Sequence, residues 1–396
     1  MIQSVGAAWL MTELTRSHVL IALVQASATI PIMLFGVFAG AIADNFDRRR
    51  VMLAAQCGML AISSVLALLT QAGAITPALL LVMTLGVGTG TAINAPAWQA
   101  SVRRTVGPRD LPQAISLNTI AFNLARSVGP ALGGLLISIT TAAAAFAVNA
   151  ASYLAMIIVL LRWRPAPNPG NGQRERQPML AAIAEGVTYS ARSRPIRRIL
   201  ARGLVIGFGV AGYQALLPAV ARDRLHGSEI EYGLMLGAFG IGSILVALVV
   251  GRARRRWGSE TVIGAATIAF ILAELTIAQA TALPLALVAT FLAGAGWVAA
   301  LTSLNIAMQL RSPEAILGRC LSLYQAVTFG GMALGAWAWG VAADAVSLTF
   351  AIHAAAVWLA LSLVLMRLFA PMPGRDEGRI DAAPPIAEAA EEAGAT

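Results

Sequence analysis

The residues of this chain that could do chemistry are a few ionisable side chains set in long apolar stretches. Arg126 lies near the middle of the stretch 113–138, Glu13 lies near the end of the stretch 1–14, and Glu274 lies inside another such stretch. An arginine at the centre of a membrane-spanning helix costs roughly 2.5–3.5 kcal/mol if it faces lipid. Arg126 should therefore face a cavity, an anionic ligand or an acidic partner, and Glu13 and Glu274 are the candidate partners.

The sequence lacks the residue sets that enzymes use. It has no pair of histidines with metal-ligand spacing, no Gly-x-Ser-x-Gly element and no acidic pair on one helix face. A phosphate-binding loop of the Gly-x-x-x-x-Gly-Lys type is excluded, because all 28 basic residues are arginines. Cys57 and Cys320 are expected to pack as small apolar side chains. We therefore predict no enzyme, no metal site and no cofactor.

The elements that must position Arg126 and the two glutamates are membrane-spanning helices. Of the 396 residues, 58% are hydrophobic and only 12% are charged, and the mean hydropathy of +0.74 is far above that of soluble domains. A helix needs roughly 20 apolar residues to cross a bilayer. Stretches of this kind run over residues 18–43, 51–71, 77–100, 113–138, 144–162, 199–221, 231–251, 260–280, 283–310, 315–341 and 347–370. Residues 1–14 form a further, incomplete span.

A polar segment rich in proline and glycine divides these spans into two sets. The sequence predicts an N-terminal helical bundle over 1–162, a linker with a short surface helix over 163–198, a C-terminal helical bundle over 199–370 and a disordered tail over 371–396.

The two halves show a weak internal repeat. Gln3 matches Gln214 and Gly40 matches Gly251 at an offset of 211 residues, whereas later in each half the offset is 206. Since the first span of the second half begins near Ile199, its counterpart would begin before Met1. We therefore expect a first helix that is truncated at its N-terminus.

Arginines gather in alternate loops. Arg16, Arg222 and Arg224 fall on one side of the expected membrane, and most of the others, including the linker arginines, fall on the opposite side. The positive-inside rule then places the central linker and the C-terminus in the cytoplasm. The net charge of +9 reports this topology and not nucleic-acid binding, because no basic run is interleaved with exposed aromatic residues.

Several motifs together resemble one known family. Residues 40–50, GAIADNFDRRR, resemble the Gly-x-x-x-Asp-x-x-Gly-Arg-Arg loop of the major facilitator superfamily, with Asp47 in place of the inner glycine. The segments 14–17 (LTRS), 184–195 (AEGVTYSARSRP) and 123–134 (NLARSVGPALGG) resemble its branch of bacterial siderophore and drug exporters, the transmembrane secretion effectors. The resemblance covers nearly the whole chain. It implies a major facilitator fold with two six-helix bundles in the bacterial inner membrane.

The resemblance also implies a conformational latch on the cytoplasmic side. In the superfamily, the aspartate of this loop contacts the end of helix eleven and nearby basic residues and steadies the outward-facing state. The matching residues here are Gly40, Asp44, Arg48 and Arg49, with Arg319 in the receiving region. The arginines could instead serve only as topology anchors.

The fifth span resembles an exporter signature, and it also contains Arg126. The signature residues are Gly129, Pro130, Gly133 and Gly134, which are held to limit leakage but could equally provide ordinary close packing. Arg126 and Glu13 are the expected coupling or substrate-binding pair, because the first and fifth helices line the cavity in this fold. Arg126 could instead bind an anionic substrate directly or form a structural salt bridge.

Other polar and aromatic residues fall in spans that line the transport path by resemblance. The cavity candidates are Gln25, Asn118, Asn123, Tyr213, Gln214, Asn305, Tyr324 and Gln325. Each of them alone is more often a helix-to-helix hydrogen bond than a ligand contact.

The sequence thus predicts a monomeric secondary transporter that exports an amphipathic small molecule, such as a siderophore or an antibiotic, by proton antiport. Residues 79–90 lack the fourth-helix arginine that drug antiporters of this superfamily carry, which is a departure from the pattern of proton-coupled members. The alternatives are uptake of a small metabolite by the same fold and a transport-inactive, truncated relic.

Overall fold

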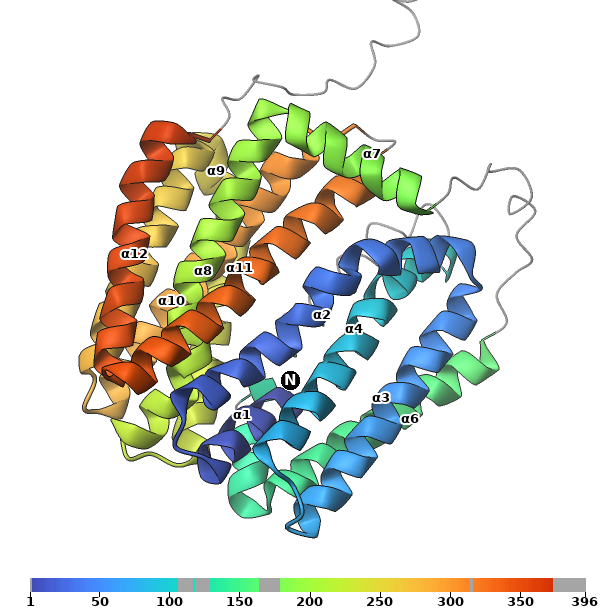
Figure 1. Ribbon diagram of the computed structural model, residues 1–396, viewed down its shortest axis with the longest axis vertical. Helices are drawn as coiled ribbons and strands as arrows, with labels where there is room; N and C mark the ends of the chain where they lie inside the picture. Colours follow the sequence, from blue (N-terminus) through green and yellow to red (C-terminus); the bar gives the residue numbers. More distant parts are fainter. Residues whose placement is uncertain are drawn as a thin grey trace, which may run out of the picture.

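The structure is a computed structural model that describes residues 2–105, 117, 121, 125, 129–130, 132–163, 179–313 and 316–372. Its elements are α-helices (Figure 1). They are α1 (Ile2–Leu14), α2 (His18–Asn45), α3 (Arg48–Gln71), α4 (Pro77–Thr105), α6 (Ala142–Arg162), α7 (Met179–Arg192), α8 (Arg194–Asp223), α9 (Glu229–Gln279), α10 (Leu283–Gln309), α11 (Leu317–Ala345) and α12 (Leu348–Phe369).

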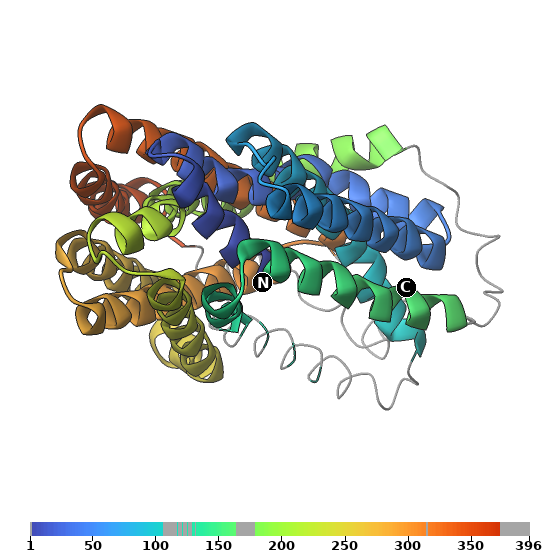
Figure 2. The same cartoon turned by 90° about the horizontal axis from the view of Figure 1, so that it is seen from below.

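The helices form two bundles, in agreement with the predicted all-helical fold of two bundles. In the N-terminal bundle α2 packs on α4, and α3 packs on α4 and α6. In the C-terminal bundle α9 packs on α10, and α12 packs on α8 and α9. The bundles meet chiefly along α2 and α11, which run side by side through the middle of Figure 1. Figure 2 shows the same two groups of helices from below.

Nine of the described helices are long and apolar enough to cross a membrane. Their outer faces carry large apolar side chains; on α12, for example, Val357, Leu361, Val364 and Leu368 are all exposed. Exposed aliphatic residues in such numbers are unfavourable in water but suit contact with lipid tails. The helices therefore form a multi-pass membrane protein.

Helix α9 joins two predicted spans, 231–251 and 260–280, in one continuous element. Its 51 residues would extend about 75 Å if straight, more than twice the thickness of a bilayer core. The chain instead turns at Gly258, whose φ of 83° lies in the left-handed region that glycine adopts without strain. The prediction of two spans is retained, but a kink and not a loop separates them.

Polar side chains cap the N-termini of other helices. The Asp47 carboxylate accepts a hydrogen bond from the backbone N–H of Arg50 and caps α3, and Ser228 and Glu231 form a capping box at the start of α9. Each cap satisfies backbone donors that the first helical turn leaves free. Helix α7 occupies the part of the linker where a short helix is expected, and it packs against α8 and α11.

Candidate functional site

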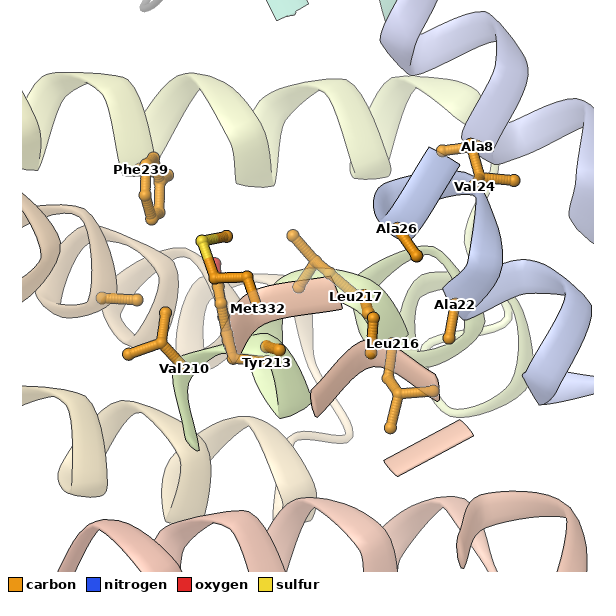
Figure 3. Close-up of a cluster of buried hydrophobic side chains, with 14 of the residues drawn as sticks. Ala8, Ala22, Val24, Ala26, Val210, Tyr213, Leu216, Leu217, Phe239 and Met332 are labelled. Atoms are coloured by element: carbon orange, nitrogen blue, oxygen red, sulfur yellow. The ribbon is translucent and has the colours of Figure 1, made fainter. Parts of the chain in front are cut away.

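The interface between the bundles is the candidate site, and one part of it is filled by apolar side chains. Figure 3 shows residues of α1 and α2 beside Leu216 and Leu217 of α8, with residues of α8, α9 and α11 continuing the same buried cluster into the C-terminal bundle. The labelled members are Ala8, Ala22, Val24, Ala26, Val210, Tyr213, Leu216, Leu217, Phe239 and Met332. Side chains of this kind exclude water from the interface without linking the bundles covalently or by charge.

Glycines bring the two bundles into backbone contact beside this cluster. A Cβ atom on Gly134 would lie 2.5 Å from the backbone oxygen of Glu229 and 2.9 Å from the Cα of Gly233. A Cβ atom on Gly340 of α11 would lie 2.9 Å from the Cα of Val19 in α2. Any larger residue at these positions would push the helices apart.

A polar cluster joins the bundles at the same end of the molecule. The carboxylate of Asp344, in α11, accepts hydrogen bonds from the backbone N–H of His18 (2.6 Å) and of Val19 (3.1 Å) and from the hydroxyl of Ser17 (2.7 Å). The C-terminal bundle thus caps the N-terminus of α2, where the helix dipole favours a negative charge.

The imidazole of His18 extends this cluster. Its Nδ1 lies 2.8 Å from Asp344 Oδ1, and its Nε2 lies 3.2 Å from Asp223 Oδ2. Both ring nitrogens therefore face carboxylates from the other bundle, and only the imidazolium form can donate to both.

Arg222 completes the contact. Its guanidinium pairs with Asp223 at 2.5 Å and donates to the backbone oxygens of Thr12 and, at 2.9 Å, of Thr15. We call Ser17, His18, Arg222, Asp223 and Asp344 the His18 cluster, and we call this end of the interface the His18 end.

The opposite end, which carries Arg48–Arg50 and is called the Arg48 end, is arranged differently. Arg49 donates to the backbone oxygens of Leu160 (2.6 Å) and Leu161 (2.8 Å), within its own bundle. Arg319 pairs with Glu185 of α7 at 2.5 Å. In the C-terminal bundle Arg202 pairs with Glu260 at 2.8 Å.

Comparison with known proteins identifies the family. The family model of the transmembrane secretion effectors matches residues 1–391. The chain belongs to this family. It is therefore a transporter of the major facilitator superfamily and not an enzyme.

Individual relatives lie within the same branch. The chain is 29% identical to the multidrug efflux pump Tap of Mycolicibacterium fortuitum over 91% of this chain and 88% of that protein. It is 28% identical to the enterobactin exporter EntS of Shigella boydii over 84% of this chain and 81% of that protein. It is 24% identical to the staphyloferrin A transporter of Staphylococcus aureus over 63% of this chain, and the match spans only 62% of that transporter's length.

Solved structures share the fold at low sequence identity. A crystal structure of the nucleoside transporter NupG matches with a TM-score of 0.75 at 14% identity, over 92% of this chain and 94% of that one. A transporter of the POT family matches with a TM-score of 0.73 at 10% identity, over 93% of each chain.

The family resemblance predicts a latch, and its residues are only partly described. Gly40 and Asp44 belong to the last part of α2, but their side chains lie outside the described part of the structure. Arg48 is half-buried, and Arg49 and Arg319 contact α6 and α7 as given above. The latch around Asp44 therefore stays a prediction.

The predicted coupling and cavity residues are also only partly described. Arg126, Asn118 and Asn123 lie outside the described residues. Glu13 is exposed at the His18 end, where its carboxylate accepts a hydrogen bond from Trp9 Nε1 at 3.0 Å. Trp9 in turn stacks on Tyr232 of the other bundle, with ring centroids 6.2 Å apart.

The glycines of the fifth-helix signature lie at the close contacts between helices. Gly133 packs against α1, where an added Cβ would be 3.2 Å from the Cα of Ile2. Gly134 meets Gly233 as described, and the backbone oxygen of Pro130 would lie 3.2 Å from a Cβ on Gly233. Gly129 is half-buried. These positions agree with the close packing expected of small residues, and their role in export stays a prediction.

The remaining cavity candidates occupy different surroundings. Tyr213 is buried inside the C-terminal bundle between Phe239 and Phe270. Tyr324 is buried and donates to the Leu301 oxygen at 3.4 Å.

Four amides share no common pocket among the described contacts. Asn305 accepts from Gln309 at 2.6 Å, Gln325 is exposed, and Gln25 and Gln214 are half-buried.

The sequence reasoning missed the His18 cluster. Asp344 and Asp223 are isolated acids at the ends of spans, and His18 directly follows the LTRS segment, which by itself indicates only a family resemblance. The available signal was weak: acids at span ends on the side that carries few arginines.

Proposed function

We propose that this chain exports an amphipathic small molecule from the bacterial cytoplasm by alternating access, with proton antiport as the driving force. The observation that carries the proposal is the closed His18 end. There, two bundles of a transporter fold are held together by contacts that can break and reform. Such contacts let one side of a central cavity be sealed while the other is open.

The strength of these contacts suits a reversible gate. A net hydrogen bond contributes about 0.5–1.5 kcal/mol, so the cross-bundle hydrogen bonds of Asp344 and Arg222 together contribute a few kcal/mol. Two conformations that interconvert during a cycle differ by a similar amount. Water can replace each of these polar contacts when the bundles separate.

The arginine distribution supports an orientation. Under the positive-inside rule the Arg48 end, the linker and the C-terminus lie in the cytoplasm and the His18 end faces outward. The described conformation would then be the one that is closed to the outside. The relatives named as exporters or efflux pumps support outward transport of a siderophore or a drug.

Substrate and proton binding are assigned to the interface between the bundles. Arg126 would bind an anionic substrate or an acidic partner from the fifth span, and Glu13, near the outward face, would serve as a proton acceptor. The latch around Asp44 would stabilise the alternative, outward-open conformation at the Arg48 end.

Transport can be tested in inverted membrane vesicles that contain the full chain. A pH gradient is imposed, and enterobactin, staphyloferrin A and ethidium are added one at a time. We expect at least one of these probes to collapse the gradient, and Arg126→Ala to abolish that response. Arg252→Ala is the matched control, because Arg252 is an exposed arginine outside the proposed site.

Two outcomes would count against the proposal. A folded, inserted protein that gives no response to any probe contradicts proton-coupled export of this substrate class. A response that Arg126→Ala leaves intact removes Arg126 from the mechanism.

A further inference from the structure

Glu274 is a carboxyl group buried within the membrane-spanning part of the C-terminal bundle. It lies in the second half of α9, and none of its surface is exposed. Neither carboxyl oxygen has a hydrogen-bond partner among the described residues. The backbone of Tyr213, on α8, lies near the carboxyl group but does not meet the geometry of a hydrogen bond to it.

The surroundings of Glu274 are aromatic and neutral. The ring of Tyr213 lies edge-on to Phe270, one turn before Glu274, with centroids 5.9 Å apart. On the facing helix α10, the uncharged and buried Thr290 lies near Tyr213 and the buried Trp297 lies near Phe270. Among the described residues, the titratable groups on this side of Glu274 are the phenol of Tyr213 and the phenol of Tyr232, which lies near Tyr213.

An ionised carboxylate would be costly in this position. Moving an unpaired charge into such an environment costs several kcal/mol, whereas the neutral acid avoids most of that penalty. Packing alone does not explain the residue, because an apolar side chain of similar volume would fill the space at lower free energy.

The internal repeat offers a direct comparison. At the offset of 211 residues, Glu274 corresponds to Ser63 in the N-terminal bundle. The Ser63 hydroxyl donates to Gln3 Oε1 at 3.0 Å and accepts from Asn149 Nδ2 at 3.2 Å. Gln214 corresponds to Gln3 at the same offset, but the second offset of 206 residues places Ala355 at the position of Asn149, so the C-terminal bundle lacks one of the two amides of this network.

We propose that Glu274 is a proton-binding site of the transport cycle; this inference rests on the proton antiport proposed above. The carboxyl is fully enclosed, and a proton is a ligand that it can bind without additional space. It takes up one proton when the His18 end opens and holds it as a neutral acid while that end is closed. It then loses the proton toward the Arg48 end as substrate binds.

The first test is infrared spectroscopy of the purified full-length chain, which needs no substrate. A protonated carboxylic acid has a carbonyl stretching band separate from those of amides and carboxylates. We expect this band near neutral pH in the wild type, its loss in Glu274→Gln, and its retention in Glu185→Gln, which removes an exposed carboxylate. An unchanged band in Glu274→Gln overturns the assignment.

The second test separates proton coupling from transport. In proteoliposomes, Glu274→Gln should still exchange labelled probe across the membrane without a pH gradient but should lose proton-driven accumulation, and Glu274→Asp should restore part of that accumulation. Retained accumulation in Glu274→Gln overturns the inference. So does loss of exchange together with accumulation in folded protein, because that result indicates a structural role.

The same experiment distinguishes this inference from the proposed function. A wild-type chain that exchanges probe but moves no protons contradicts antiport itself. A wild-type chain that exchanges no probe contradicts transport of these molecules. Proton movement that is equal in the wild type and in Glu274→Gln contradicts only the role of Glu274.

Discussion

The two ends of the bundle interface use charged residues in different ways. At the His18 end, Asp344 and Arg222 reach from the C-terminal bundle to backbone groups of the N-terminal bundle. At the Arg48 end, Arg49 and Arg202 make their described contacts within their own bundles. Asp344 and Arg222 therefore hold the bundles together at the His18 end, whereas Arg49 and Arg202 stabilise their own bundles at the Arg48 end.

Burial of the basic side chain distinguishes the contacts within one bundle from those between the bundles. Arg202 is 2% exposed and also donates to the backbone oxygens of Ala370 and Met366. Its partner Glu260 is 31% exposed, but the Arg202 guanidinium is held out of water by these three contacts, so it is suited to a permanent contact. In the His18 cluster the basic side chains are more accessible to water, because that of His18 is 19% and that of Arg222 is 23% exposed, against 3% for the side chain of Arg202. The carboxylates of Asp344 and Asp223 are exposed about as much as that of Glu260. Contacts that must open in each cycle are expected to have this character.

The largest effect on closure of the His18 end should come from a substitution at Gly134. In Gly134→Ala the new Cβ would meet backbone atoms of Glu229 and Gly233, which cannot rotate away. We expect the closed His18 end to lose about 3 kcal/mol, the upper part of the range for overpacking. Spin labels at Arg16 and Val346 should then report a longer distance between the bundles.

Gly58→Ala is the matched control for this prediction. A Cβ on Gly58, in α3, would meet nothing within 4 Å. The substitution should leave the label distance unchanged and should stabilise the helix by about 0.5–1 kcal/mol. If both variants leave the distance unchanged, the glycine contact does not control closure.

A smaller effect is expected from Asp344. Asp344→Ala removes the acceptor for the N-terminus of α2 and for Ser17, so the closed end should lose about 2 kcal/mol. Asp344→Asn keeps one acceptor oxygen and should lose less. The same spin labels measure both variants, and equal distances in Ala, Asn and wild-type proteins would show that the cap does not hold the bundles.

Local sequence patterns predicted the helices well, because each apolar run of about 20 residues has to become a span in lipid. They also predicted close helix contacts around Gly133 and Gly134, since small residues at helical spacing allow them. They could not predict the His18 cluster: His18 and Asp344 are 326 residues apart, and no periodicity connects them. The kink at Gly258 was missed for a related reason, because a polar turn within a continuous helix resembles a loop.

The smallest effect, and the sharpest test of the predicted latch, concerns Arg319. Arg319 forms an ion pair with Glu185, and the two side chains are 30% and 53% exposed. A surface ion pair of this kind contributes at most about 1 kcal/mol. If Arg319 acts only through its ion pair with the linker helix, Arg319→Gln should hardly change the label distance at the His18 end.

The family latch around Asp44 predicts a different result for the same variant. If Arg319 also steadies the outward-open conformation, Arg319→Gln should shift the population toward a closed His18 end and shorten the mean label distance. Glu185→Gln provides the control, because it removes the linker ion pair and leaves Asp44 intact. A shift in Arg319→Gln alone would make the Arg48 end a second gate, and equal behaviour of the two variants would confine gating to the His18 end.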